Sequence, residues 1–374
     1  MYFSDRPKAK KENFYDRDEE LNKLVNSLKE GAALTVIKGL RRLGKSSLMF
    51  IGLSSARLPY LLIDCRQLEE VAYSSRRVLI EVLEESINNF IREHRGLWST
   101  LKEYLKKVNG IKINEFSVTF NWGGENPLST VGLFDTLNKF AVNRKIKVVI
   151  AIDEAQQLKK ITNFNISKLL AHIYDYKGNL QLLLTGSQVG LLDDLLGIDD
   201  PSSPLYGRAR SEITLNRLST EQSIEFLKKG FKQCRMKVDS ETIEYAVKKL
   251  DGIIGWLSNF GWQCYLERKI SRQLIDKLLK EASKLGFKEF ENFTLKRPAA
   301  DRYNIIMKRA AKEPARWAQL KVHLESETGA KIYDANLTNL LNELLKAGFL
   351  EIEDGFYKIA DPVLAYAIYP QKLE

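Results

Sequence analysis

The stretch that decides the fold is KGLRRLGKSS, residues 38–47 of a chain of 374 residues. It fits the phosphate-binding pattern G-x-x-x-x-G-K-[ST], with Gly39, Gly44, Lys45 and Ser46 at the fixed positions. An apolar run at 33–37 precedes the pattern, and a helical segment follows it from Ser46. Glycines let such a loop curl so that backbone N–H groups point at phosphate oxygens, and the following helix adds its positive end. The sequence therefore predicts a phosphate-binding loop between a strand and a helix.

The residue types within this loop indicate its chemistry. A lysine at position 45 reaches the β- and γ-phosphates of a nucleoside triphosphate, and the Ser46 hydroxyl is a ligand for Mg²⁺. Two further cations, Arg41 and Arg42, occupy free positions of the pattern. Because backbone N–H groups face inward in such loops, we expect both side chains to point outward, toward other modules or a neighbouring subunit. Direct phosphate contact is the alternative. The predicted nucleotide-binding residues of the loop are Gly39, Leu40, Arg41, Arg42, Leu43, Gly44, Lys45, Ser46 and Ser47.

Two acids follow an apolar strand pattern at 148–152. Ligands of open α/β sheets bind outside the carboxyl ends of the strands, which is where Asp153 and Glu154 stand. Asp153 is expected to hold the metal, directly or through water, and Glu154 to orient or deprotonate the attacking water. The alternative is that the two acids cap the next helix.

Two further candidate groups come later in the chain. Thr185 and Ser187 end the apolar run at 180–185, where a hydroxyl can sense a γ-phosphate or simply cap a helix. Arg208 lies in a loop after the predicted sheet, where an arginine can neutralise charge in the transition state or remain a solvated surface group. The predicted catalytic residues are Glu154, Lys45, Arg208 and Ser187.

Strand and helix patterns alternate through the first part of the chain. The apolar strand patterns lie at 33–37, 59–64, 147–152 and 180–185, with amphipathic helical patterns between them. Strands that are apolar throughout indicate a parallel sheet covered on both faces. The alternation of Val118, Phe120 and Trp122 predicts a strand or hairpin inserted near 111–122. The fold class is therefore α/β, a P-loop NTPase sheet with helices on both faces.

Strand signals stop after Leu218. Helical patterns at 220–231, 240–250, 256–266 and 270–285 predict a helical lid module. Three short helices near 301–311, 315–326 and 334–347, followed by two short strands turning at Asp354-Gly355, give the outline of a winged helix-turn-helix. The predicted domains are a P-loop core at 1–218, a helical lid at 219–297 and a winged helix at 298–374.

Composition narrows the class of protein. Apolar residues make up 44% and charged residues 28% of the chain, as in ordinary globular proteins. No apolar run approaches the roughly 20 residues that span a bilayer, and the polar N-terminal stretch is no secretory signal. Three isolated cysteines, Cys65, Cys234 and Cys264, and three widely separated histidines predict neither disulfides nor a zinc site. These features predict a cytoplasmic protein without a membrane partner.

Taken together, these motifs resemble those of the archaeal P-loop ATPases of the STAND class, relatives of AAA+ proteins. The loop at 39–46 is similar to the family's G-x-R-R-x-G-K-[ST], and Asp153-Glu154 to its acidic strand end. Thr185-Gly-Ser187 resembles its sensor strand, and Tyr206-Gly-Arg208 its G-R element. The Asp361-Pro pair looks like the D-P that closes the family's winged helix.

Residues 14–21, FYDRDEEL, resemble the family's N-terminal h-h-G-R-E-x-E element, which sits by the nucleotide base. The resemblance therefore implies that Phe14 and Arg17 bind the nucleotide. Asp16 stands where glycine is usual, and 252–256 occupies the place of a G-x-P motif without its proline. The resemblance further implies ATP and ADP with Mg²⁺ as cofactors, and a nucleotide-gated switch that moves the helical and winged-helix modules.

A winged helix raises the question of DNA, which the charge distribution answers in part. The net charge of the whole chain is +10, which permits an anionic partner without demanding one. From 301 to 374 there are ten Lys/Arg and eleven Asp/Glu, and the candidate recognition helix at 333–346 has one cation and two acids. Because phosphate binding needs several cations on the docking face, an intramolecular or protein-contacting role is favoured over DNA. The stretch 267–297 has nine basic and five acidic residues, which we interpret as a solvated helix face.

Three functions stay open from the sequence. The favoured one is Mg-dependent ATP binding and hydrolysis that drives a conformational switch, with a protein partner or self-association. The second is an ATP-gated DNA-binding protein related to archaeal replication initiators. The third is an ATP-binding signalling scaffold with little turnover.

Overall fold

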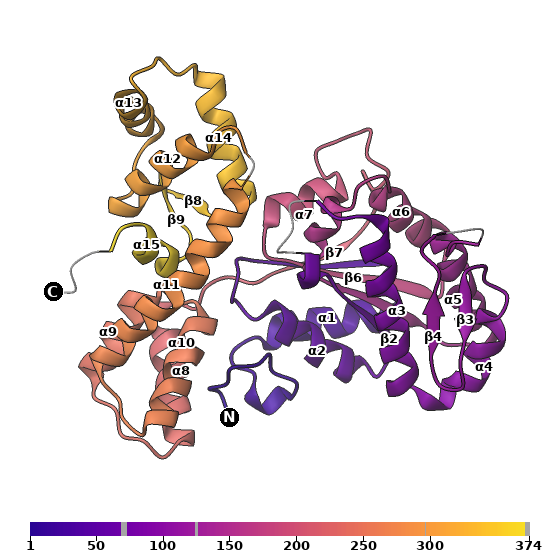
Figure 1. The fold of residues 1–374 in the computed structure, drawn as a ribbon. Helices are drawn as coiled ribbons and strands as arrows, with labels where there is room; N and C mark the ends of the chain where they lie inside the picture. Colours follow the sequence, from indigo (N-terminus) through magenta and orange to yellow (C-terminus); the bar gives the residue numbers. More distant parts are fainter. Residues whose placement is uncertain (69–72, 124–125, 296, 371–374) are drawn as a thin grey trace.

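The computed structural model describes residues 1–68, 73–123, 126–295 and 297–370. Its centre is a five-stranded sheet in the order β2-β5-β6-β1-β7 (Figure 1). All neighbouring strands of this sheet run parallel. The strands are β1 (Leu34–Lys38), β2 (Tyr60–Asp64), β5 (Val148–Asp153), β6 (Leu180–Gly186) and β7 (Ser211–Thr214). The predicted α/β class is confirmed.

Helices cover both faces of this sheet. The central strands carry apolar side chains on both faces, and these side chains are buried in two separate cores. Val36 and Ile150 belong to one buried core, while their neighbours Ile37 and Val149 belong to the other. Residues of α3 (Arg76–Glu93), α4 (Arg95–Leu105), α5 (Thr130–Asn143), α6 (Ile166–Tyr176) and α7 (Val189–Leu196) join the first core. Residues of α1 (Asp18–Glu30), α2 (Lys45–Ala56), α8 (Thr220–Gln233), α9 (Ser240–Leu250) and α10 (Ile254–Glu267) join the second.

The predicted insertion is a hairpin of two short antiparallel strands, β3 (Ile111–Ile113) and β4 (Val118–Phe120). It lies with α4 and α5 at the end of the molecule opposite the C-terminal modules (Figure 1). Three short 3₁₀ turns complete this part: η1 (Lys11–Asn13), η2 (Cys65–Leu68) and η3 (Ala155–Lys160). The position of η3 matters for the site, because it begins directly after Glu154.

Helix α11 (Arg272–Thr294) runs from the helical module into the winged helix (Figure 1). The sequence prediction ended this helix at 285, but it continues through Gly286. A Cβ at Gly286 would lie 3.6 Å from the Cα of Leu364, so the glycine lies where the C-terminal helix crosses closely. Leu278 and Leu279 of α11 belong to the second core, and Phe290 belongs to the core of the winged helix. One helix is therefore part of two cores.

The C-terminal module has the predicted outline of a winged helix. It contains α12 (Ala300–Lys312), α13 (Trp317–Thr328), α14 (Asp334–Lys346), β8 (Leu350–Glu353), β9 (Phe356–Ile359) and α15 (Pro362–Ile368). The wing turns at Asp354 and Gly355, which both have positive φ, as a two-residue hairpin turn requires. Lys296, at the predicted boundary, is outside the described residues.

Some elements were not predicted from the sequence. Strand β7 has the sequence SEIT and buries only Ile213 among its four residues, so it lacks the apolar run of a central strand. The helices α1, α4 and α7 also had no counterpart in the prediction. Within the described ranges, no helix combines the length and the apolar character needed to cross a membrane. The domain boundaries at 218 and 297 stay predictions.

Candidate nucleotide site

The phosphate-loop pattern lies between β1 and α2, at the carboxyl edge of the sheet. Gly39 has φ of 148°, and a Cβ there would lie 2.5 Å from the carbonyl oxygen of Leu215, so only glycine fits. Gly44 has φ of 94° and is the N-cap residue of α2. The two glycines thus give the loop its curvature and direct the positive end of α2 toward a cavity.

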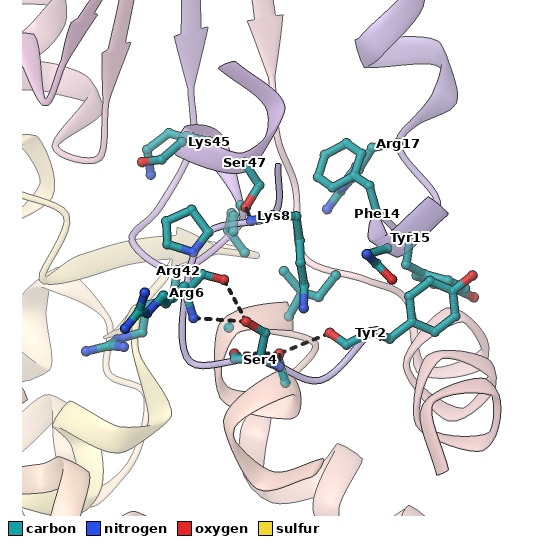
Figure 2. A pocket seen from close by; sticks show the side chains of 18 of the residues that line it. Tyr2, Ser4, Arg6, Lys8, Phe14, Tyr15, Arg17, Arg42, Lys45 and Ser47 are labelled. Atoms are coloured by element: carbon teal, nitrogen blue, oxygen red, sulfur yellow. Dashed lines mark hydrogen bonds between the residues drawn. The ribbon is translucent and has the colours of Figure 1, made fainter. Parts of the chain in front are cut away.

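That cavity has a volume of about 280 Å³ and lies between the phosphate loop, the N-terminal segment and α10 (Figure 2). Leu43, Gly44, Lys45, Ser46 and Ser47 line it from the loop, together with Arg42 and Glu154. Phe14 and Arg17 line it from the N-terminal side, and Ile254, Gly255, Ser258 and Asn259 from α10. The structure therefore brings most of the predicted nucleotide-binding residues to one cavity. Leu40 and Arg41 instead line a small crevice against the C-terminal modules.

Lys45 is the cation at the inner end of this cavity. Its side chain is buried, and its ammonium donates to the carbonyl oxygen of Leu40 at 2.6 Å. Burial lowers the pKa of Lys45 to about 8, although the charges of Glu154 and Asp153 oppose this shift. A buried ammonium held by a neutral carbonyl gains most from an anionic ligand, which is the condition that a phosphate meets.

Asp153 ends β5 and is 1% exposed. Ser46 Oγ donates to its carboxylate at 2.9 Å, and the Thr185 hydroxyl donates from the neighbouring strand β6. Burial raises the pKa of Asp153, and the hydrogen bonds from Thr185 and Ser46 only partly offset this. A buried carboxylate beside a hydroxyl, with no cation among its hydrogen-bond donors, is a donor set that suits Mg²⁺. The residues present therefore fit the predicted metal.

Glu154 has φ of 55°, a left-handed conformation that turns its side chain away from the strand direction. Its carboxylate accepts from the Ser187 hydroxyl at 2.5 Å and from the Gln156 amide at 2.5 Å. Burial alone would raise the pKa of Glu154, but the charge of Lys45 and these hydrogen bonds hold it below its ordinary value. The two adjacent acids thus have pKa values shifted in opposite directions, a pattern common at catalytic sites.

The helix-cap alternatives for these residues are wrong. Glu154 precedes η3 but makes no side-chain cap hydrogen bond, and the N-cap residue of α7 is Gln188 rather than Ser187. The hydroxyls of Thr185 and Ser187 both point to the acids of β5 instead. Ser46 and Thr185 are therefore hydrogen-bonded to Asp153, and Ser187 to Glu154. The backbone N–H of Glu154, which donates to the Thr185 hydroxyl at 3.1 Å, joins the two sets.

Two predicted catalytic residues do not line the cavity: Ser187 reaches it only through its hydrogen bond to Glu154, and Arg208 lies elsewhere. The Arg208 guanidinium forms two hydrogen bonds with the carboxylate of Asp175 on α6, at 2.9 and 2.6 Å. It does not line the cavity beside Lys45. In this arrangement Arg208 stabilises the loop before β7, and a catalytic role for it stays a prediction.

The N-terminal element at 14–21, which the resemblance places by the nucleotide base, has a left-handed residue where the family has glycine. Asp16 adopts φ of 49°, the left-handed conformation for which the family has glycine and which aspartate tolerates. Arg17 is buried, pairs with Glu20 at 3.0 Å and donates to the carbonyl oxygen of Asn216. Its side chain therefore forms the wall of the cavity and also fixes the start of α1.

The two loop arginines contact the C-terminal modules. Arg41 pairs with Glu289 of α11 at 2.7 Å, and the Arg42 guanidinium lies 3.8 Å from the ring centre of Trp256 on α10. The N–H of Gly255 donates to the carbonyl oxygen of Arg42 at 2.9 Å. A Cβ at Gly255 would lie 2.7 Å from the Cβ of Arg42, so the glycine permits this approach where the family motif has proline nearby.

Part of the cavity wall was missed by sequence reasoning. Tyr2, Ser4 and Lys8 of the N-terminal segment line the cavity, with Lys8 next to Ser47 (Figure 2). These residues belong to no motif, and the local signal is limited to the apolar pair Tyr2-Phe3 in an otherwise polar stretch.

A phosphate loop, an adjacent acidic strand end and a cavity between them define a P-loop ATPase. Comparison with known families supports this class, because a model of the ATPase domain found predominantly in Archaea matches residues 14–260. The chain belongs to this archaeal ATPase family. A second model, of the C-terminal winged helix-turn-helix domain of MCM proteins, matches residues 297–360.

Solved structures give the same result. A Walker-type ATPase of Pyrococcus abyssi is 35% identical with a TM-score of 0.79, and the alignment covers 98% of this chain and 99% of that one. The ORC2 protein of Aeropyrum pernix, solved in ADPNP-ADP complexes, is 14% identical with a TM-score of 0.57 over 98% of each chain. This second likeness concerns the fold alone. A comparison with curated protein sequences gives no significant match.

Proposed function

We propose that this ATPase hydrolyses Mg-ATP in the cavity beside Lys45, and that the nucleotide cycle changes how the helical and winged-helix modules contact the phosphate loop. One observation carries the proposal. The loop that directs Lys45 to the cavity also directs Arg41 to Glu289 and Arg42 to Trp256. A change in loop conformation on nucleotide binding therefore acts on α10 and α11 directly.

The binding roles follow from the positions of the side chains. The backbone N–H groups of the loop and the start of α2 hold the phosphates, and Lys45 binds the β- and γ-phosphates. Ser46 and Asp153 would hold Mg²⁺, which supplies charge neutralisation on the phosphate oxygens when bound. The Phe14 and Arg17 side of the cavity accommodates the base. The solved ADPNP-ADP complexes of ORC2 support adenine nucleotides as ligands for this fold.

Glu154 is the proposed general base. Its lowered pKa keeps the carboxylate ionised at neutral pH, as acceptance of a proton from water requires. The Ser187 hydroxyl holds this carboxylate in the observed arrangement, through a hydrogen bond from the end of β6. Glu154 must leave or share this hydrogen bond when it activates a water molecule, so Ser187 links catalysis to β6.

The winged helix contacts both Ser187 and the phosphate loop. A Cβ at Gly348, just after α14, would lie 3.4 Å from the carbonyl oxygen of Ser187 and 3.9 Å from the side chain of Leu40. On the other side of the module, Arg217 pairs with Glu351 of the wing at 2.9 Å. Movement of Ser187 or of the loop during turnover therefore alters the surface that the winged helix contacts.

The test is phosphate release by the wild type and by Glu154→Gln in the presence of Mg-ATP. We expect the variant to lose at least about a hundredfold in turnover, the typical contribution of a general base, with ATP affinity within about threefold of the wild type. Glu30→Gln, at an exposed acid of α1, is the matched control and should turn over normally. If the wild type releases no more phosphate than Glu154→Gln, the chain is an ATP-binding scaffold and the hydrolytic proposal fails.

The switch has its own measurement. Hydrogen exchange in α14 and the wing should differ between the ATP-bound Glu154→Gln variant and the ADP-bound wild type. Equal exchange in the two states would contradict the switch while leaving hydrolysis intact.

A DNA-binding function has less support from the contacts. Lys346, the cation of the candidate recognition helix, pairs with Asp194 of α7 at 2.8 Å, and Glu351 of the wing is occupied by Arg217. These two charged residues of the module thus form ion pairs with other parts of the same chain. A gel shift on duplex DNA with and without ATP decides the matter, because salt-sensitive binding tighter than micromolar would favour the DNA function.

A further inference from the structure

The N-terminal arm, residues 1–8, is fixed to the helical module by one aromatic side chain. Phe3 is 0% exposed and lies between α8 and α10, with its ring centre 5.0 Å from that of Phe231. Gly230 and Gly261 leave room for it, since a Cβ at either position would lie 2.2 or 2.4 Å from an atom of the Phe3 ring. Because any side chain on these two glycines would displace the ring, the fold contains a specific seat for Phe3.

From this seat the arm crosses to the phosphate-loop helix. The N–H of Ser4 donates to Ser258 Oγ of α10 at 3.1 Å, and the same hydroxyl donates to the carbonyl oxygen of Tyr2 at 3.3 Å. At the far end, the N–H of Lys8 donates to Ser47 Oγ of α2 at 2.9 Å. The arm is therefore held at both ends across one side of the nucleotide cavity.

Lys8 is the cation that this arm brings into the cavity. Figure 2 shows it between Ser47 and Ser4, among the side chains that line the cavity. Its ammonium donates to the carbonyl oxygen of Met1 at 3.1 Å, and among the described residues it forms no ion pair with a carboxylate. Burial lowers the pKa of Lys8 to about 8, with Asp5 opposing the shift. A half-buried ammonium with a neutral acceptor gains most from an anion.

The place of this ammonium differs from that of Lys45. The Lys45 ammonium donates to the carbonyl oxygen of Leu40, whereas the Lys8 ammonium donates to that of Met1. The backbone of Lys8 is bound two residues after Lys45, at Ser47. In phosphate loops the lysine serves the β- and γ-phosphates, while the α- and β-phosphates lie toward the first turn of the helix. The backbone of Lys8 is therefore anchored on the side of the α-phosphate, and its flexible four-carbon side chain can turn from the carbonyl oxygen of Met1 toward the phosphates.

We propose that Lys8 is a further nucleotide-binding residue, which contacts the phosphates from the α-phosphate side and makes the N-terminal arm part of the site. The inference rests on the proposed function, because it requires the nucleotide to bind in this cavity. It adds a second cation, from a different segment of the chain, to the one that the phosphate-loop pattern supplies.

The experiment measures the affinity of the full chain for ADP and for adenosine, by displacement of a fluorescent ADP analogue. Lys8→Gln should weaken ADP binding about tenfold, as expected for one lost charge-assisted contact, and leave adenosine binding unchanged. Lys8→Arg should retain ADP affinity within about threefold, because the charge is kept. Lys10→Gln, at an exposed lysine of the adjoining segment, is the matched control and should bind both ligands like the wild type.

Lys45→Ala in the same assay separates the two proposals. If Lys45→Ala abolishes ADP binding while Lys8→Gln stays within twofold of the wild type, the role of Lys8 is refuted and the site stands. If Lys8→Gln weakens adenosine as much as ADP, Lys8 acts on the base side and the phosphate contact is refuted. If Lys45→Ala binds ADP like the wild type, the cavity is not the nucleotide site, and the proposed function and the role of Lys8 fail together.

Discussion

The two sides of the phosphate loop differ in what they contact. On one side Lys45, Ser46 and Glu154 line the cavity, and Ser46 is hydrogen-bonded to Asp153. On the other side the loop contacts helices that begin more than two hundred residues later in the chain, through the Arg41–Glu289 ion pair and the stacking of Arg42 on Trp256. A single loop thus serves both ligand binding and contact with the modules, and Arg42 lines the cavity as well as stacking on Trp256.

This difference implies that substitutions on the two sides should have different effects. Changes on the cavity side should lower affinity or turnover. Changes on the module side should leave affinity nearly intact and alter the attachment of α10, α11 and the winged helix.

The largest expected effect is that of Lys45→Ala. Removing the ammonium deletes charge-assisted hydrogen bonds to the phosphates, so ADP affinity should fall about a hundredfold. Isothermal titration with ADP measures the loss, and Lys29→Ala, at an exposed lysine of α1, is the control. Unchanged affinity in the Lys45 variant would remove the basis for the cavity side of the comparison.

A smaller effect should follow from pH. The pKa of Lys45 is about 8 in the free protein, where Glu154, Asp153 and Arg41 are the charged groups that act on it. At pH 7 the ammonium is formed and can bind phosphate. Above pH 8 binding must be accompanied by proton uptake, so ADP affinity should fall by up to about tenfold per pH unit between 8 and 9. The measurement is ADP affinity at pH 7, 8 and 9.

Lys45→Arg is the control for this pH dependence. A guanidinium stays charged throughout the range, so the loss of affinity above pH 8 should become smaller in this variant. An identical pH profile in both proteins would show that another group titrates.

The smallest effect on affinity should come from the double variant Arg41→Ala/Arg42→Ala. A partly buried ion pair and a cation–π contact each contribute about 1 kcal/mol. Arg41 lies outside the cavity, and Arg42 lines it while its guanidinium stacks on Trp256. ADP affinity should stay within about threefold of the wild type, while hydrogen exchange in α10 and α11 increases and phosphate release changes. A collapse of affinity equal to that of Lys45→Ala would identify the arginines as phosphate ligands and abolish the distinction between the two sides.

The fold could be predicted from the sequence for those elements whose burial in the structure produces a recognisable local pattern of apolar residues. The strands β1, β5 and β6 are mostly apolar because they are buried on both faces, so their sequences alone identify them. The edge strand β7 contributes one buried residue, Ile213, and therefore has no local signature. Helix α11 was cut short at Gly286, since glycine is a poor helix former. Gly286 is required because α15 crosses α11 closely at this point, and a contact between distant segments leaves no local sequence pattern.

The candidate site, too, could be predicted from the sequence only where its residues belong to local motifs. Lys45, Ser46, Asp153 and Glu154 follow from motifs with fixed spacing, and the structure brings them together. The arm was missed because its seat consists of Gly230 and Gly261, far from Phe3 in sequence, and an absent side chain gives no signal.

Helix α11 has a consequence for the stability of the whole C-terminal half. Leu278 and Leu279 are packed in one core and Phe290 in another, and a continuous hydrogen-bonded backbone joins them. Loss of packing around Phe290 exposes the end of the helix and shortens it toward Leu279, so damage in the winged helix lowers the stability of α8–α10 as well. Heating should therefore melt both modules in one cooperative transition, rather than releasing the winged helix first.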